Sequence, residues 1–144
     1  MVITVKFMND SKTAKCQHCN KSTSLVTGDF IYNHRPDLHT LNFWYCANCR
    51  AYVGCHKKGA RTQFGISDGT LPLGTAANAR LRELRKDAHN VFDNLWKNQE
   101  FSRDGAYLQL AYYLRIKKDD CHMALFDDEQ CKKVIKFCYS LMRK

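Results

Sequence analysis

Two pairs of cysteines with the same spacing are the strongest chemical signal in the sequence. A C-x-x-C segment turns the backbone so that both sulfurs lie on one side, and two such knuckles together supply four thiolates. Four thiolates match the tetrahedral ligand set that Zn²⁺ prefers. We therefore predict a closed structural zinc site made by Cys16, Cys19, Cys46 and Cys49. Two disulfides or a redox-active dithiol are the alternatives.

Two Cys-His dipeptides, Cys55-His56 and Cys121-His122, are the next candidates for chemistry. Together they could form a second metal site or a thiol–imidazole pair. Adjacent residues of a strand point to opposite faces, so each dipeptide offers one convenient ligand unless it lies in a turn. Packing cysteines and hydrogen-bonded histidines are the simpler interpretation. His18 lies inside the first knuckle, where four cysteines already complete the ligand set, so we expect it at the surface.

His89 and Asp93 stand four residues apart in a helical pattern, so the carboxylate can orient the imidazole. Nucleases use such pairs together with a catalytic metal or a second acid. The sequence shows no HExxH motif, glycine-rich phosphate loop or nucleophile elbow beside them. We therefore expect no catalytic residues, although enzymatic activity stays open.

Basic residues outnumber acidic ones and give the 144-residue chain a formal charge of +9. Such a balance favours anionic partners, of which nucleic acid is the most common. Phosphates could be contacted by basic side chains, and a base could stack on a tryptophan. The candidate residues are Lys57, Lys58 and Arg61 in a loop, and Arg82, Arg85, Lys86, His89 and Trp96 on a helix.

Short β-branched and aromatic runs surround the knuckles and predict antiparallel hairpins. The expected strands cover residues 2–7, 22–26, 29–32, 41–45 and 51–54. This layout is typical of a zinc ribbon. Because so few apolar residues lie there, metal binding must supply much of its folding free energy. We expect a chelator to unfold residues 14–56 before the rest of the chain.

The C-terminal half carries the three- and four-residue apolar spacing of helices. Thr75 is the expected N-cap of a helix that runs to about Lys97. A second helix is predicted from Ser102 or Arg103 to about Ile116, and a third begins at Asp127 or Asp128. The predicted fold class is α+β, with a zinc ribbon packed on a bundle of about three helices.

The predicted boundaries place the ribbon lobe at residues 1–58, a linker or ordered loop at 59–74 and the helical lobe at 75–144. We expect the whole chain to fold as one unit. The chain has eight cysteines but begins without the long apolar stretch of a signal peptide. It also lacks the roughly 18 apolar residues of a membrane span. A reducing cytoplasm is therefore the expected compartment.

An ordered series of motifs extends the pattern beyond the knuckles. It comprises Ala51 to His56, Pro72 to Thr75, Leu81 to Trp96 with its two arginines and its Ala-His pair, and Cys121 to Asp127. The series resembles a family of small zinc-finger-containing proteins, frequent in phages and prophages and of undefined function. The resemblance implies a phage or bacterial cytoplasmic origin. It also implies that the finger and the helices form one unit.

Three functions follow in order of expectation. The first is binding of DNA or RNA without catalysis. The second is an interaction module that modulates or inhibits a host enzyme or a defence system. The third is a nuclease that uses His89 and Asp93.

Overall fold

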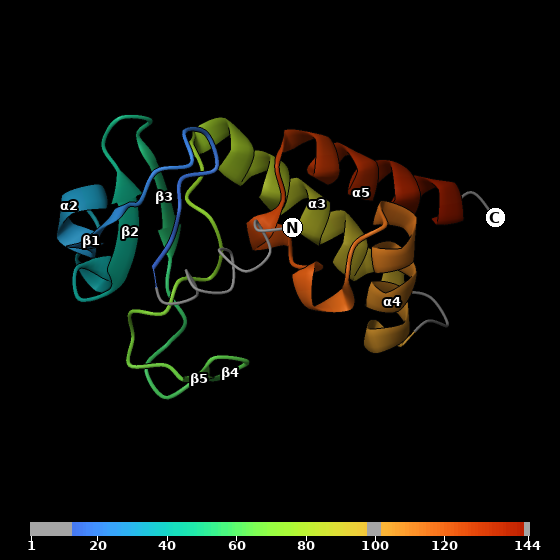
Figure 1. Cartoon of the computed structure of the whole chain (residues 1–144), viewed down its shortest axis with the longest axis horizontal. Coiled ribbons are helices and arrows are strands. Elements are labelled where there is room, and N and C mark those ends of the chain that lie inside the picture. The colour runs from blue at the N-terminus through green and yellow to red at the C-terminus, as the bar shows by residue number, and fades with distance from the viewer. Residues whose placement is uncertain (1–12, 98–101, 143–144) are drawn as a thin grey trace. The chain divides into compact units, whose positions relative to one another are not determined.

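The computed structural model describes residues 13–97 and 102–142, so the strand predicted at 2–7 lies outside the described residues. The chain divides into two compact units, residues 1–78 and 79–144 (Figure 1). The first holds the strands and both cysteine pairs, and the second holds the long helices. The predicted α+β class is therefore confirmed, with antiparallel strands in the N-terminal part and helices in the C-terminal part.

A three-stranded antiparallel sheet forms the centre of the first unit. Its order is β1 (Ser24–Thr27), β2 (Asn42–Cys46) and β3 (Ala51–Gly54). The register aligns Leu25, Trp44 and Val53 across the sheet. Because side chains alternate between the two faces, Trp44 and Val53 lie on the face that also carries Cys46. All three are buried in one core cluster, so the sheet and the cysteines share a single apolar core.

The strand predicted at 29–32 is wrong, because a short helix, α2 (Gly28–Ile31), occupies this segment. Its backbone begins so close to the following loop that a Cβ on Gly28 would lie 1.7 Å from the carbonyl oxygen of Leu38. Only glycine permits this approach. The helix packs the ring of Phe30 edge-on against Tyr45, with ring centroids 5.1 Å apart.

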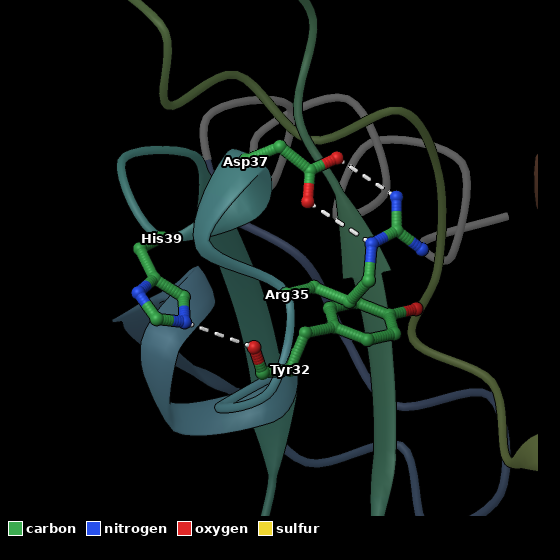
Figure 2. Close-up of polar contacts among 4 residues, drawn as sticks. All are labelled: Tyr32, Arg35, Asp37 and His39. Atoms are coloured by element: carbon green, nitrogen blue, oxygen red, sulfur yellow. Dashed lines mark hydrogen bonds and ion pairs between the residues drawn. The ribbon is translucent and has the colours of Figure 1, made fainter.

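The loop from α2 to β2 contains the 3₁₀ turn η1 (Pro36–Leu38) and is tied by side chains (Figure 2). Arg35 makes a bidentate pair with Asp37, with Nε–Oδ1 and Nη2–Oδ2 distances of 3.0 and 2.8 Å. The Nε2 atom of His39 lies 3.1 Å from the carbonyl oxygen of Tyr32. Asp37 therefore neutralises the charge of Arg35, and the guanidinium holds the pKa of that carboxyl below its usual range.

Residues 71–77 run beside β3 instead of starting a helix. Tyr52 and Ala77 exchange both backbone hydrogen bonds at 3.0 Å, and the amide of Gln17 donates to the carbonyl oxygen of Ala76 at 2.9 Å. The prediction that Thr75 caps a helix is therefore wrong, and the helix begins at Ala79. Thr75 instead donates its hydroxyl to the side chain of Gln17 at 2.8 Å.

A two-residue turn joins the short strands β4 (Arg61–Thr62) and β5 (Gly65–Ile66), which form a separate hairpin of the first unit (Figure 1). Arg61 pairs with Ile66, and Thr62 pairs with Gly65. The side chain of Thr62 closes the turn, because its hydroxyl donates to the carbonyl oxygen of Gly65 at 2.7 Å.

Three helices form the second unit: α3 (Ala79–Lys97), α4 (Arg103–Leu114) and α5 (Asp128–Met142). Short 3₁₀ turns, η2 (Lys118–Asp120) and η3 (Met123–Leu125), connect α4 to α5. The helix α3 packs against both α4 and α5. Its fully buried face includes Leu81, Ala88 and Phe92, which agrees with the apolar stripe predicted from the spacing. Among the described residues, no helix is long and apolar enough to cross a membrane.

The predicted starts of α4 and α5 are confirmed by their caps. The hydroxyl of Ser102 accepts a hydrogen bond from the amide of Gly105 at 2.9 Å. Before α5, Asp127 and Gln130 each bond the other's backbone amide through a side-chain oxygen, at 2.8 and 3.2 Å. These are the reciprocal contacts of a capping box, which satisfies backbone donors at a helix start.

Candidate metal centre and nucleic-acid surface

Four cysteine sulfurs converge at one end of the ribbon sheet. The Sγ atoms of Cys16, Cys19, Cys46 and Cys49 all lie within 4.8 Å of one another. Those of Cys19 and Cys46 are 3.8 Å apart. A tetrahedron with zinc–sulfur bonds of about 2.3 Å has sulfur–sulfur edges of about 3.8 Å. The spacing of the sulfurs therefore fits a zinc ion at their centre.

The backbone of each knuckle is shaped to aim its sulfurs inward. The amide of His18 points at Cys16 Sγ, 3.4 Å away, and the amide of Asn20 donates to the carbonyl oxygen of Cys16 at 2.9 Å. The residue after each second cysteine is left-handed, with φ of 63° at Asn20 and 53° at Arg50. The two knuckles therefore share a left-handed residue directly after the second cysteine.

The surroundings of Cys16, Cys19 and Cys49 shift the pKa values of their thiols. Burial raises the pKa of Cys16, and burial together with the neighbouring thiols raises that of Cys49 to about 12. The backbone amide of Lys21 lowers the pKa of Cys19. Four thiolates at this separation repel one another unless a cation lies between them. A divalent metal with a preference for sulfur supplies that cation.

Cys55 and Cys121 do not have the environment of reactive thiols. Cys55 packs against the cysteine core of the ribbon, and Cys121 is buried in the second unit. Burial raises the pKa of each to about 11, whereas nucleophilic cysteines have a lowered pKa. Within the described residues, the four-cysteine cluster is the only group of three or more such side chains placed to hold a metal ion. The packing interpretation of both cysteines is thus the better supported.

The predicted basic loop is an ordered projection that we call the hairpin arm, residues 57–66. Lys57, Lys58 and Arg61 are all exposed on it. Two apolar side chains are exposed beside them, Phe64 at 40% and Ile66 at 68%. Sequence reasoning missed these two residues, although apolar residues within a polar, glycine-containing loop were a visible signal.

The buried Ser67 joins the two ends of the hairpin arm at its base, and two side chains of β2 bond the residues that follow. The hydroxyl of Ser67 donates to the carbonyl oxygen of His56 at 3.1 Å and accepts from the amide of Gly69 at 3.0 Å. The indole of Trp44 donates to the carbonyl oxygen of Thr70 at 2.8 Å, and Asn42 donates to that of Gly69 at 3.0 Å. The arm therefore starts from a hydrogen-bonded base on β2.

The predicted basic stripe of α3 is exposed only in part. Lys86 and His89 are exposed and Arg82 is half-buried. Arg85 is only 8% exposed, and its Nε donates to the carbonyl oxygen of Phe126 at 2.8 Å. Burial lowers the pKa of this guanidinium to about 10. Arg85 therefore belongs to the helical core and is excluded from the candidate contact surface.

His89, Asp93 and Trp96 form a chain of hydrogen bonds along α3. Asp93 accepts at one oxygen from His89 Nδ1 and at the other from Trp96 Nε1, both at 3.0 Å. The predicted orientation of His89 by Asp93 is therefore present. The guanidinium of Arg103 lies over the half-buried Trp96 ring, 5.9 Å from its centroid. The indole is thus tied on its nitrogen and covered by a cation.

Comparison with protein families agrees with the metal centre. The model of a zinc-finger-containing domain of unknown function matches residues 12–140, which include all four cysteines of the cluster, α3, α4 and all but the last two residues of α5. No curated protein and no solved structure matches the chain. The match covers most of the sequence, and the chain therefore belongs to the zinc-finger-containing domain family, with a structural zinc site at Cys16, Cys19, Cys46 and Cys49.

Proposed function

We propose that the protein binds nucleic acid without catalysis, through the hairpin arm of its zinc ribbon. The observation that carries this proposal is the combination of side chains on the arm. Three exposed cations, Lys57, Lys58 and Arg61, stand on the same short projection as the exposed Phe64 and Ile66. Cations that contact phosphates and aromatic rings that stack on bases are two components of nucleic-acid-binding surfaces, and on the arm the ring is that of Phe64.

The rigid base of the arm favours binding. A flexible loop loses conformational entropy when it binds, whereas an ordered one has lost it on folding. The bonds made by Ser67, Trp44 and Asn42 fix the base of the arm before any ligand arrives. The structural zinc contributes indirectly, because Trp44 belongs to the same core as the cysteines.

A second set of contacts belongs to α3. Lys86 and His89 are exposed on it, with Arg82 half-buried next to them along the helix. The overall charge of +9 adds long-range attraction to a polyanion. The cellular setting that we propose with this function is the bacterial cytoplasm, following the resemblance to phage and prophage proteins.

Binding can be tested by fluorescence anisotropy with labelled single-stranded DNA, RNA and duplex DNA of one sequence. Each phosphate contact releases counterions, so between about 50 and 200 mM salt three contacts predict a loss in affinity of about 40-fold for duplex DNA and about 18-fold for a single strand. No binding to any of the three ligands, or an affinity that is flat across this range, would contradict the proposal.

Docking on a host protein is the second candidate, and one surface of the ribbon favours it. Leu25 and Phe30 are 43% and 62% exposed and line the same shallow hollow with Val26 and Asn42. Replacing Phe30 with Glu should abolish capture of a protein partner from nuclease-treated lysate and leave nucleic-acid affinity almost unchanged. The reverse result, lost nucleic-acid binding with capture intact, would exclude this surface as the docking site.

A further inference from the structure

The hairpin arm carries its cations and its apolar side chains at different levels along its length. Lys57 and Lys58 begin the arm, and Arg61 opens its first strand, β4. Phe64 lies in the turn between β4 and β5, and Ile66 lies level with Arg61 on the returning strand. No acidic residue occurs between positions 57 and 66. The base of the arm is therefore cationic, and an exposed aromatic ring lies at its tip.

The turn that carries Phe64 is held by hydrogen bonds. The amide of Phe64 donates to the hydroxyl oxygen of Thr62 at 3.0 Å, and that hydroxyl donates to the carbonyl oxygen of Gly65 at 2.7 Å. Gly65 has a φ of 108°, which glycine adopts without the strain of a side chain. The backbone under the ring is thus fixed before a ligand binds, which lowers the entropic cost of inserting the ring.

The arm is long enough to cross a groove of DNA, and Figure 1 shows it projecting away from the three-stranded sheet. The base of the arm is closed by the amide of Ser67, which donates to the carbonyl oxygen of Ala60 at 2.8 Å. From Ala60 the chain takes three steps to the turn residue Gln63, which span about 10 Å in extended backbone. The minor groove of B-DNA is about 7.5 Å deep. Phe64 can therefore reach the base pairs while the base of the arm stays at the phosphates.

The order of side chains along the arm matches a duplex better than a single strand. A duplex has its phosphates outside and its bases inside, so a projection that enters it meets phosphates near its own base and base pairs at its tip. Proteins that bind single strands instead stack successive bases on several aromatic rings. Phe64 is the only aromatic residue of the arm.

Apolar side chains that enter DNA from the minor groove act as wedges. Phenylalanine and isoleucine are both used in this way: the side chain stands between two base pairs, unstacks them and kinks the duplex. The kink also opens the minor groove, which is otherwise only about 6 Å wide and too narrow for a two-stranded ribbon with its side chains. Phe64 and Ile66 are both exposed for this role.

We propose that the hairpin arm inserts Phe64 between two base pairs of duplex DNA from the minor groove and kinks the duplex. Ile66 lies against the unstacked base pair, and the cations of the arm contact the flanking phosphates. This inference rests on the nucleic-acid binding proposed above and narrows its ligand to duplex DNA. An RNA duplex has a wide, shallow minor groove instead, which a narrow projection does not fill.

Fluorescence energy transfer between the two ends of a DNA duplex of roughly 25 base pairs measures the kink. Saturating zinc-loaded wild type should bend the DNA by roughly 20–90° and so raise the transfer. Phe64→Ala keeps all cations of the arm, so it should bind with the salt dependence of the wild type but leave the transfer unchanged. Tyr112→Ala is the matched control, because it removes an aromatic side chain that is 87% exposed on α4, outside the arm. It should bend DNA as the wild type does.

The outcomes separate the kink from binding itself. Salt-dependent binding by the wild type without a rise in transfer would overturn the kink and leave nucleic-acid binding in place. A Phe64→Ala variant that bends DNA as the wild type does would show that the ring is not inserted. Tighter binding of single-stranded DNA or of an RNA duplex would overturn the choice of ligand. No binding to any of these ligands would contradict both proposals.

The flexibility of the DNA gives an independent test. Pyrimidine–purine steps unstack easily, whereas A-tracts are stiff and have a narrow minor groove that attracts cations. Insertion therefore predicts that the wild type binds a duplex of repeated TA steps more tightly than an A-tract duplex of the same composition, and charge alone predicts the reverse. Phe64→Ala should lose this preference for TA steps. A wild type that prefers the A-tract, or binds both equally, would contradict insertion.

Discussion

The side chain of Arg85 donates from Nε to the backbone carbonyl oxygen of Phe126 at a distance of 2.8 Å. Phe126 is itself almost fully buried and precedes α5. One arginine of α3 thereby fixes the turn that leads into the last helix. The basic stripe of α3 thus combines a structural cation with exposed ones.

Replacing Arg85 with Met should destabilise the second unit by roughly 1.5–3 kcal/mol, because it leaves a buried carbonyl group without its charged donor. Lys86→Met is the matched control. Lys86 is the exposed neighbour of Arg85, and its replacement should change the free energy of unfolding by at most about 0.5 kcal/mol. Urea denaturation followed by circular dichroism measures both. Equal stabilities of the two variants would show that the Arg85 contact is dispensable.

Removal of zinc should unfold the ribbon before the helices. Structural zinc contributes folding free energy on the order of 10 kcal/mol, and the ribbon core is built around its ligands, Cys16 and Cys46. Hydrogen exchange after addition of a chelator should show lost protection in β1–β3 and retained protection in α3 and α5. Protection that falls to the same extent in both units would instead indicate that they fold as one.

The two kinds of cysteine in the ribbon should respond differently to substitution. Cys46→Ser removes a metal ligand, so zinc content and native strand signal should fall together. Cys55→Ser changes a thiol that packs against the same core but lies outside the cluster. It should retain one zinc per chain, measured by atomic absorption. Zinc retained by Cys46→Ser, or lost in Cys55→Ser, would require a different ligand set.

Arg50 should be replaceable by glycine with a gain in stability. Its φ of 53° is left-handed, a region that costs roughly 1–2 kcal/mol for residues with a side chain. Arg50→Gly relieves that cost and should raise the thermal midpoint of the zinc-loaded protein, whereas Arg50→Ala should not. If the glycine variant melted no higher than the alanine variant, the knuckle conformation would be in doubt.

Sequence spacing was sufficient where residue types at a fixed spacing have one dominant chemistry, as metal-binding cysteine pairs and helix caps do. The C-x-x-C pairs predicted the cysteine cluster, and Ser102 and Asp127 predicted the starts of two helices. Local signals failed where backbone pairing with a distant strand decides. Thr75 has the chemistry of an N-cap, yet residues 71–77 pair with β3, which uses their backbone groups for a different purpose.

Among the candidate site residues too, some positions were predicted correctly from the sequence and others were not. Lys57 and Arg61 are exposed as expected for a basic loop, because a charged side chain is placed in solvent unless a partner holds it. Arg85 has such a partner in the carbonyl group of Phe126, 41 positions away in the sequence. No helical pattern could distinguish it from Lys86. Phe64 was visible in the sequence as an apolar residue in a polar loop, but its exposure follows only from the paired hairpin.

Nucleic-acid binding by the hairpin arm is tested most directly by the salt dependence of a charge-removal variant. The variant changes Lys57, Lys58 and Arg61 to Ala. Its matched control changes three exposed lysines of the second unit, Lys118, Lys132 and Lys136, and so removes the same charge. With duplex DNA as the ligand, the slope of log affinity against log salt should become shallower by about 2.7 in the arm variant and stay almost unchanged in the control. Equal slopes in the two variants would contradict the account.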